Sequence, residues 1–308
     1  MAESSGFLSA LISEVSGVVR APVREMVMGS ALTTFAIGGP VRALVSVDTP
    51  EELANVLRLL SSSGQPWRVL GNGSNVLFAD AGFDGWLIKL GAGFKRVSPL
   101  EGGRFEVFAA TPLMSYSRKV SDEGFSGLEF AAGIPASVGG AVYMNAGAHG
   151  AEISSLIVEV RGLTGEGGEI RWLRHELPWS YRHSGLPNGC VITSVVLDLP
   201  PGDPKRISEQ CAHNLAERRA RQPLALPSAG SVFKNPSSGL PAGKILEEIG
   251  MKGFAVGGAE VSRLHANWIV NPDRGATAAD VVSVIDECQR RALQERGVAL
   301  EPEVRLWV

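Results

Sequence analysis

The sequence is poor in the residues that metal centres and disulfide frameworks need. Only three of its 308 residues are cysteine, namely Cys190, Cys211 and Cys288, and no two of them have CxxC spacing. An odd and scattered set of cysteines argues against a disulfide framework or a zinc site and is typical of a reducing cytosol. The five histidines have neither HxH nor HExxH spacing, so we assign no metal.

The sequence also lacks a strong charge of either sign and a long apolar run. The formal net charge is −3, which gives no indication of a nucleic-acid partner. No apolar run approaches the roughly 18 residues that span a bilayer. Residues 1–20 contain Glu3 and Glu14 and lack the basic n-region of a secretory signal. We therefore expect a cytoplasmic protein that neither binds nucleic acid nor inserts into a membrane.

Glycine, by contrast, is abundant. The chain has 37 glycines, and sixteen of them lie between Gly64 and Gly150. Because glycine weakens helices and strands, such a cluster indicates tight turns or backbone that approaches a ligand closely. The rest of the composition, with 44% hydrophobic and 20% charged residues, is that of a globular protein, and the length favours about two domains.

The spacing of apolar residues predicts an α+β chain. Helices are expected at residues 7–19, from 49–52 onward, at 113–123, from 207 to 221 and at 278–296. Strands are expected at residues 43–47, 67–70, 76–78, 85–90, 105–110, 157–163, 169–173 and 191–199. The stretch 200–204 (PPGDP) is typical of a linker and separates a glycine-rich first two thirds from a smaller last third.

The glycine loop at residues 71–75 (GNGSN) follows a predicted strand. A dinucleotide-binding fingerprint would need glycine or alanine at position 76 and a helix there, whereas Val76 begins another predicted strand. This is therefore a strand–loop–strand turn. Its successive N–H groups can form an anion nest without a helix dipole, with Ser74 and Asn75 adding side-chain donors. A plain glycine turn is the alternative.

Residues 133–147 (GIPASVGGAVYMNAG) are more informative. Between positions 126 and 150 only Glu129 is charged, yet glycine and proline disfavour a simple core helix. The backbone amides of such a stretch need partners if it is buried. A bound cofactor with phosphate and carbonyl groups would supply them, and the alternative is an irregular loop whose amides pair with neighbouring chain.

Other candidate groups lie further along the chain. Arg182 could clamp a carboxylate through two parallel N–H bonds, or it could be an ordinary surface arginine. Residues 228–236 (SAGSVFKNP) offer a hydroxyl, an amine and an amide, and no histidine lies nearby in sequence to make Ser231 an acyl nucleophile. The basic cluster at residues 218–221 is either a solvated helix face or a phosphate contact. From the residues alone no reaction can be named.

Taken together, eight segments resemble the UDP-N-acetylenolpyruvoylglucosamine reductases, the MurB flavoenzymes of peptidoglycan synthesis. They occur in the family's order at residues 33–39 (TTFAIGG), 71–75, 133–147, 181–184 (YRHS), 228–236, 242–244 (AGK), 265–267 (HAN) and 300–304 (LEPEV). The resemblance implies a two-subdomain FAD-binding part of the vanillyl-alcohol-oxidase (PCMH) type, followed by a smaller α+β substrate-binding domain. It divides the chain into an N-terminal helix (1–20), two FAD-binding subdomains (21–91 and 92–204) and the substrate domain (205–308). The short chain is similar to the shorter, second type of the family.

The resemblance also implies non-covalent FAD, with NADPH as its reductant and a sugar nucleotide as the small-molecule substrate of an expected monomer. The cofactor contacts that it implies are Gly71, Asn72, Gly73, Ser74, Asn75, Gly133, Ile134, Pro135, Ser137, Val138, Gly139, Asn145, Ala146 and Ile192. The substrate contacts that it implies are Arg221, Lys234 and Asn235.

The chemistry implied by the resemblance is reduction of an enolpyruvyl ether to the lactyl ether of UDP-N-acetylmuramate, a cell-wall precursor needed for cell shape and division. Flavin N5 hydride goes to the terminal vinyl carbon. Arg182 and a protonated Glu303 match the family residues that stabilise the enolate-like charge, and Ser231 matches the donor of the proton to the α-carbon.

Two positions depart from the family pattern. Ala136 stands where glycine is common, and His149 stands where a tyrosine that helps to hold the nucleotide is usual, which puts substrate contact at 149 in doubt. Two other hypotheses stay open. A flavin oxidase of the same fold would react rapidly with oxygen, and a degenerate flavin-binding sensor would bind the sugar nucleotide without turnover.

Overall fold

The computed structural model describes residues 2–237 and 239–307, and for residues 2–6 the backbone alone. The chain forms two compact units, each assembled from separate segments. The first unit contains the chain up to Glu25, Ala43–Gly71 and Gly85–Leu215, and the second contains Met26–Arg42, Asn72–Asp84 and the chain from Ala216 onward. The division expected at residues 20, 91 and 204 stays a prediction.

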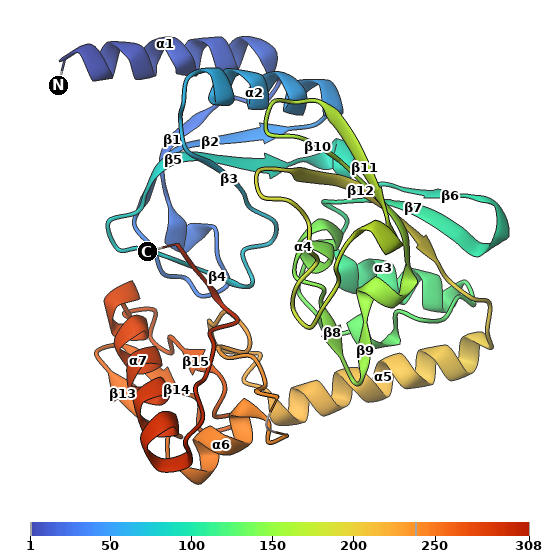
Figure 1. The fold of residues 1–308 in the computed structure, drawn as a ribbon, viewed down its shortest axis with the longest axis vertical. Coiled ribbons are helices and arrows are strands. Elements are labelled where there is room, and N and C mark those ends of the chain that lie inside the picture. Colours follow the sequence, from blue (N-terminus) through green and yellow to red (C-terminus); the bar gives the residue numbers. More distant parts are fainter. Residues whose placement is uncertain (1, 238, 308) are drawn as a thin grey trace. The chain divides into compact units, whose positions relative to one another are not determined.

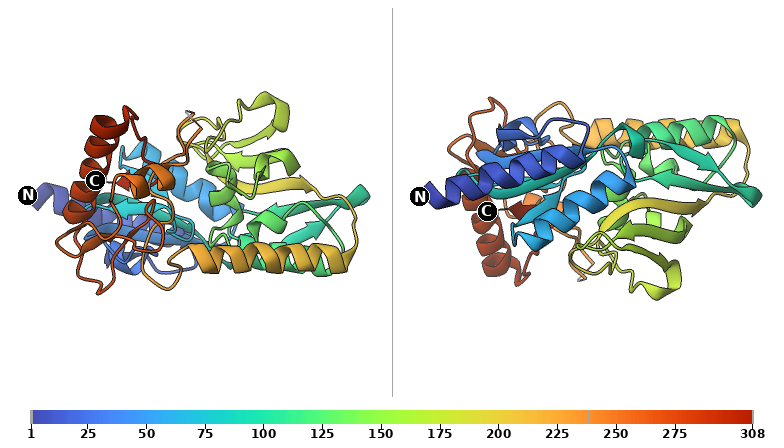
Figure 2. Two further views of the ribbon diagram at one scale, coloured as in Figure 1. Left: turned by 90° about the horizontal axis from the view of Figure 1, so that it is seen from below. Right: turned by 90° about the horizontal axis from the view of Figure 1, so that it is seen from above.

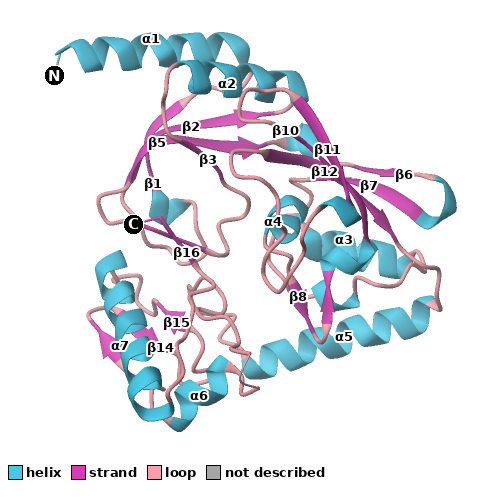
Figure 3. Ribbon diagram, viewed as in Figure 1, coloured by secondary structure: helices cyan, strands magenta, loops and turns pink. Residues whose placement is uncertain are grey.

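Two sheets belong wholly or largely to the first unit (Figures 1 and 3). The four-stranded sheet has the order β1 (Arg24–Met28), β2 (Pro40–Val47), β5 (Phe83–Leu90) and β3 (Trp67–Val69). The five-stranded sheet has the order β11 (Glu169–Leu173), β10 (Ile157–Leu163), β12 (Val191–Asp198), β7 (Arg104–Phe108) and β6 (Val97–Pro99), and all of its neighbouring strands are antiparallel.

Two helices lie side by side over the four-stranded sheet, as the right-hand view of Figure 2 shows. They are α1 (Ala2–Val18) and α2 (Pro50–Ser62). Thr49 caps α2 by accepting a hydrogen bond from the N–H of Glu52 at 3.1 Å, and Pro50 occupies the first turn. Leu53, Leu57 and Leu60 of α2 are fully buried, as their helical spacing predicts.

One face of the five-stranded sheet packs against helices, and the opposite face carries polar side chains, of which Glu159 and Ser194 are buried. Alternate residues such as Val107, Val160 and Val195 are fully buried under α3 (Leu113–Asp122) and α4 (Val138–Tyr143). On the opposite face Arg161 joins two strands by ion pairs with Glu106, at 2.9 Å, and Glu159. A short hairpin, β8 (Gly147–Ala148) and β9 (Ala151–Glu152), follows α4.

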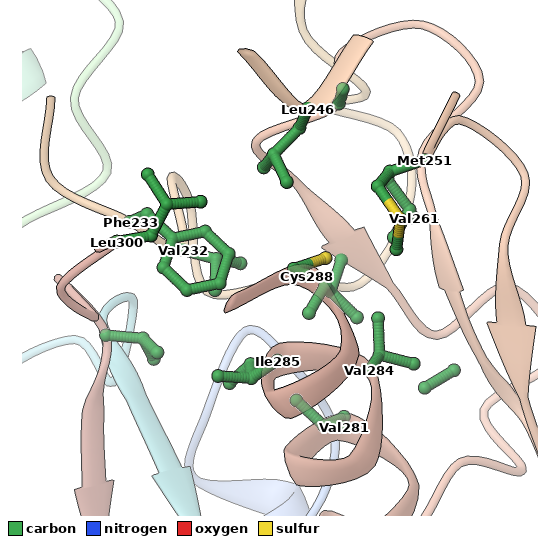
Figure 4. Close-up of a cluster of buried hydrophobic side chains, with 14 of the residues drawn as sticks. Val232, Phe233, Leu246, Met251, Val261, Val281, Val284, Ile285, Cys288 and Leu300 are labelled. Atoms are coloured by element: carbon green, nitrogen blue, oxygen red, sulfur yellow. The ribbon is translucent and has the colours of Figure 1, made fainter. Parts of the chain in front are cut away.

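The second unit is built around α7. Its core includes Val281, Val284, Ile285 and Cys288 from one face of this helix, and Phe233 lies close by (Figure 4). The elements around this core are α6 (Ala242–Glu248), α7 (Ala278–Arg296), the antiparallel sheet β13 (Ala255–Val256), β14 (Ala259–Val261), β15 (Ile269–Val270), and the parallel pair β4 (Val76–Phe78) and β16 (Arg305–Trp307). The helix α5 (Pro204–Arg221) begins in the first unit and ends in the second, because the boundary between them falls after Leu215.

The expected α+β class and most of the expected helices and strands are confirmed. The predicted linker ends one residue early, since Pro204 is the first residue of α5, a position that proline tolerates. Short 3₁₀ helices complete the described elements: η1 (Gly29–Ala31), η2 (Ala92–Phe94), η3 (Glu101–Gly103), η4 (Glu129–Ala131), η5 (Ile153–Leu156) and η6 (Arg174–Glu176). In the described part of the chain no helix is both long and apolar enough to cross a membrane.

The N-terminus of α7 depends on an aspartate far away in sequence. The carboxylate of Asp80 accepts hydrogen bonds from the N–H groups of Ala278, at 2.7 Å, and Ala279, at 3.0 Å. These charge-assisted bonds pair two of the N–H groups that a helix leaves without intrahelical partners. We expect Asp80→Ala to lower the free energy of unfolding by about 2 kcal/mol, measured by urea denaturation. Asp273→Ala, at an exposed position, is the control and should change the stability little.

Candidate active site

The glycine loop at residues 71–75 forms an anion nest at residues 73–75, which belong to the second unit. Gly73 has φ +67°, and its carbonyl accepts hydrogen bonds from the backbone N–H of Thr34, at 3.1 Å, and from the Thr34 hydroxyl, at 3.4 Å. Among the described residues, the N–H groups of Gly73, Ser74 and Asn75 donate to no protein acceptor. Three successive free N–H groups around a left-handed glycine are the arrangement that binds phosphate oxygens. The loop therefore fits the pyrophosphate of a dinucleotide cofactor.

A side chain at position 73 has no room. A Cβ on Gly73 would lie 2.2 Å from the carbonyl oxygen of Leu32, so the loop would have to move away from the segment that carries Thr34. We expect Gly73→Ala to weaken flavin binding at least about tenfold, which is about 1.4 kcal/mol. The measurement is the flavin absorbance of the purified protein relative to its absorbance at 280 nm.

The matched control for this prediction is Gly64→Ala. Gly64 has nearly the same φ, +64°, but a Cβ there meets no atom within 4 Å. Both variants accept the same left-handed strain, and only Gly73→Ala displaces the nest. Equal flavin content in the two variants would contradict a cofactor role for this loop.

Residues 133–147 contain a short helix that the sequence analysis did not anticipate. Ser137 caps α4 by accepting a hydrogen bond from the N–H of Gly140 at 3.2 Å, so a local cap overcomes the low helix propensity of two glycines. Of the two alternatives for the backbone amides of this stretch, pairing with neighbouring chain holds for most of them. The N–H groups of Val138 and Gly139, for example, donate to the carbonyls of Thr111 and Ala109.

At least three amides of this segment do remain for a ligand, and the N–H of Gly133 in the described part of the chain is one of them. Among the described residues, the N–H groups of Ala136 and Ser137 have no protein acceptor. A Cβ on Gly71 would lie 2.7 Å from the Ser137 hydroxyl, so the start of the glycine loop and the α4 cap are adjacent within the first unit. Of the other expected cofactor contacts, the buried ones are Gly133, Val138 and Ile192; Ile134, Gly139 and Ala146 are half-buried, and Pro135 and Asn72 are exposed.

Asn145 supports the segment that carries Arg182. Its side chain is fully buried, and its amide donates to Glu152 Oε2 and to the carbonyl of Ser180, both at 2.9 Å. Its side-chain oxygen accepts from the N–H of Ser154 at 3.2 Å. These bonds occupy both N–H groups of the Asn145 side chain within the protein, and the cofactor contact expected at Asn145 stays a prediction.

Arg182 lies in a strained two-residue turn. Ser180 and His183 exchange backbone hydrogen bonds of 3.0 and 2.9 Å around it, and Arg182 itself has φ +57°. The left-handed region is unfavourable for an arginine, and residues held there are frequent at functional sites. Arg182 Nη1 donates to the carbonyl of Gly147 at 3.1 Å, so both the turn and the guanidinium are tied to the segment that contains Asn145.

In the second unit the structure brings Ser231 and Glu303 onto neighbouring backbone segments. The N–H of Glu303 donates to the carbonyl of Val232, the residue after Ser231, at 2.7 Å. Phe233 and Pro302 form an antiparallel bridge, and the N–H of Lys234 donates to the carbonyl of Glu301 at 2.9 Å. Two of the three expected catalytic residues thus share one short antiparallel pair, although they are far apart in sequence.

The glycine loop is bonded directly to the segment of Glu303 and, through Thr34, to the segment of Ser231. Asn75 Nδ2 donates to the carbonyl of Glu303 at 3.2 Å, and the Asn75 carbonyl accepts from the N–H of Arg305 at 3.0 Å, just before β4 pairs with β16. The Thr34 hydroxyl donates to the carbonyl of Ser228 at 2.7 Å. The nest, Ser231 and Glu303 therefore form one continuous structure within the second unit.

The expected substrate contacts of the second unit are less closely grouped. Lys234 forms an ion pair with Glu301 at 2.5 Å, and Asn235 Oδ1 accepts from the N–H of Ala242 at 3.0 Å at the start of α6. Arg221, at the end of α5, is exposed and lies 3.4 Å from Glu217. Arg182 belongs to the first unit and Ser231 to the second. In the described residues no cluster of His, Cys, Asp or Glu could hold a metal ion.

Comparison with known proteins adds to this geometry. Residues 222–307 match the family model described as "UDP-N-acetylenolpyruvoylglucosamine reductase, C-terminal domain", and residues 41–174 match "FAD binding domain". The UDP-N-acetylenolpyruvoylglucosamine reductase of Heliobacterium modesticaldum is 44% identical over 275 residues, which are 89% of this chain and 87% of that protein. The chain belongs to the UDP-N-acetylenolpyruvoylglucosamine reductase family. It is an FAD-dependent oxidoreductase.

Other members of the reductase family match as widely. The reductase of Bacillus subtilis is 40% identical over 89% of this chain and 90% of its own. The crystal structure of the MurB reductase from Thermus caldophilus has a TM-score of 0.80 and 36% identity, covering 93% of this chain and all of that one. The expected resemblance is thus confirmed. Berberine bridge enzyme from Eschscholzia californica, at 18% identity and a TM-score of 0.50 over 63% of this chain and 44% of its own, shares the fold alone.

Sequence reasoning missed the residues that hold this site together. Thr34 and Asn267 lie in the segments 33–39 and 265–267, which the reductase resemblance includes without giving them a role. Their contacts, to Ser228 and Phe233, join positions distant in sequence, so no local pattern predicts them.

Proposed function

We propose that this chain catalyses the NADPH-dependent reduction of UDP-N-acetylenolpyruvoylglucosamine to UDP-N-acetylmuramate in peptidoglycan precursor synthesis in the cytoplasm. The observation that carries this proposal is the junction in the second unit, where one glycine loop offers three free N–H groups, hydrogen bonds to the segment of Glu303, and is joined through Thr34 to the segment that carries Ser231. The glycine loop therefore lies beside the segments that carry the proposed proton donor, Ser231, and the carboxyl group of Glu303. This arrangement suits a reaction that adds a hydride and a proton to one double bond.

FAD, once reduced by NADPH, supplies the hydride that the terminal vinyl carbon receives. The glycine nest holds the cofactor pyrophosphate, because its N–H groups lack other acceptors, and the free N–H groups of Ala136 and Ser137 add further donors. Cofactor contacts at the other expected positions, from Gly71 to Ile192, are part of the proposal.

The residues of this chain then handle the negative charge that develops at the α-carbon and the substrate carboxylate. Arg182 donates charge-assisted hydrogen bonds to the carboxylate, and Glu303, in its protonated form, donates one as well. Ser231 gives its hydroxyl proton to the α-carbon. An unactivated hydroxyl is a weak acid, but the strongly basic carbon centre makes it adequate. Arg221, Lys234 and Asn235 bind the substrate, with Arg221 and Asn235 at its diphosphate.

The test separates the two half-reactions. The purified protein is reduced anaerobically with NADPH, and the enolpyruvyl sugar nucleotide is then added. The absorbance of the flavin band at roughly 450 nm is followed. Rapid return of the band supports the proposal. A reduced flavin that is not reoxidised by this substrate but reacts rapidly with oxygen would instead favour an oxidase of the same fold.

A further inference from the structure

We propose that Asn267 is a positioning residue for Ser231: its amide fixes the strand that follows Ser231 and thereby the direction in which the hydroxyl delivers its proton. The inference rests on the proposed role of Ser231. Asn267 is not among the expected cofactor or substrate contacts, and the segment 265–267 has no other role in the proposed reaction.

Asn267 substitutes for a neighbouring β-strand. Its side-chain oxygen accepts from the N–H of Phe233 at 2.9 Å, its amide donates to the carbonyl of Phe233 at 2.8 Å, and its own backbone carbonyl accepts from the N–H of Val232 at 2.9 Å. On the other edge the carbonyl of Val232 accepts from the N–H of Glu303 at 2.7 Å. Three of the four backbone polar groups of Val232 and Phe233 are therefore paired by Asn267.

These groups are out of reach of water. Val232 and Phe233 are 2% and 1% exposed, and Asn267 is 4% exposed. Phe233 is also fixed by the core around α7, as Figure 4 shows. Removal of the amide would leave a buried N–H and a buried C=O unpaired, and the strand would then shift to find water. Such a shift moves Ser231, the residue immediately before Val232.

The orientation of Asn267 is itself set by a neighbour. The backbone N–H of Asn267 donates to Nδ1 of His265 at 3.2 Å, which requires that nitrogen to be unprotonated. Burial, together with the nearby Lys252 ammonium, lowers the pKa of His265, so the imidazole stays neutral at neutral pH. The nearby carboxylate of Glu247 raises the pKa of His265, but by less than burial and Lys252 lower it.

Displacement of a proton donor by about 1 Å costs on the order of 100-fold in rate. We therefore expect Asn267→Ala to slow the reoxidation of reduced flavin by the enolpyruvyl sugar nucleotide by about 100-fold in anaerobic stopped-flow. Reduction of the flavin by NADPH should stay within about twofold of wild type, because that half-reaction needs no proton from Ser231. The solvent deuterium isotope effect on reoxidation should rise as proton transfer limits the rate.

Asn271 provides a matched control. It is an equally buried asparagine of the second unit, but its side chain bonds to the carbonyl of Phe35 and the N–H of Ala276 instead. Asn271→Ala should destabilise the fold comparably and leave the ratio of the two half-reaction rates unchanged. If the ratio changes equally in both variants, or in neither, the proposal is overturned.

A second variant guards against a protein that fails to fold. Asn267→Asp preserves size, and its protonated carboxyl has the same donor and acceptor as the amide, whereas the ionised form repels the Phe233 carbonyl. The flavin reoxidation rate of Asn267→Asp is divided by the wild-type rate at the same pH, so that any effect of His265 titration cancels. This ratio should rise as the pH falls. A flat ratio would overturn the inference. If the reduced flavin of the wild-type protein does not react with the substrate, the proposed function is wrong. That result is distinct from a wild-type reaction that Asn267→Ala leaves unchanged, which overturns only the role of Asn267.

Discussion

Replacement of Ser231 by alanine is expected to slow the reoxidation of the reduced flavin by the enolpyruvyl sugar nucleotide by about 10²- to 10⁴-fold, the usual contribution of a positioned acid. The variant keeps the backbone bonds around Val232 and therefore the pair formed with Glu303. Flavin content and reduction by NADPH should match wild type, because neither needs the hydroxyl. Anaerobic stopped-flow at the flavin band measures both half-reactions in one preparation.

Ser283→Ala is the control for this experiment. Ser283 is an exposed serine of α7 whose hydroxyl bonds to the carbonyl of Ala279 at 2.8 Å, so its loss should alter neither half-reaction. Wild-type reoxidation in Ser231→Ala would rule out this serine as the proton donor. Equal losses in both half-reactions would indicate a displaced cofactor instead.

Replacement of Arg182 by glycine should produce a protein that folds normally and is inactive. Glycine relieves the left-handed strain of about 1–2 kcal/mol, but the chain loses the hydrogen bond to Gly147 and the contact with the Tyr181 ring and gains backbone freedom in the unfolded state. We expect the free energy of unfolding to stay within about 1 kcal/mol of wild type. Reoxidation by the substrate should fall about 10²- to 10³-fold, because a donor to the developing charge is gone.

Arg274→Gly isolates the backbone effect. Arg274 is exposed and has φ +58°, against +57° for Arg182, so glycine relieves the same strain away from the proposed chemistry. Urea denaturation and stopped-flow should show an unchanged or raised stability with full activity. If Arg182→Gly retained wild-type reoxidation, the assignment of the enolate-stabilising role to Arg182 would be wrong.

Local sequence patterns predicted the elements whose stability is local. The start of α2 follows from Thr49 and Pro50, and the buried face of α7 follows from the spacing of Val281, Ile285 and Cys288. The strands β13, β14 and β15 have two or three residues each, too few for alternation to be visible. Helix α4 was missed because its glycines argue against a helix and its cap at Ser137 is a single side chain.

The candidate site could be predicted only through the family resemblance. Ser231 and Glu303 are unremarkable by themselves, and what makes them a pair is backbone contact between segments about seventy residues apart. The hydrogen bond from the Asn75 side chain to the carbonyl of Glu303, 228 residues further along the chain, could not be predicted from the sequence. Long-range hydrogen bonds of this kind leave no periodicity in the sequence.

The parallel pair of β16 with β4 has a consequence for synthesis of the chain. Arg305, Leu306 and Trp307 pair with Val76, Leu77 and Phe78, so the strand beside the glycine loop gains its partner only once residues 305–307 have been translated. Since domains fold as units while the chain emerges, the second unit cannot close before these residues leave the ribosome. Until then the nest lacks the segment that carries Glu303. A chain that ends before residue 303 is therefore unable to complete the candidate site.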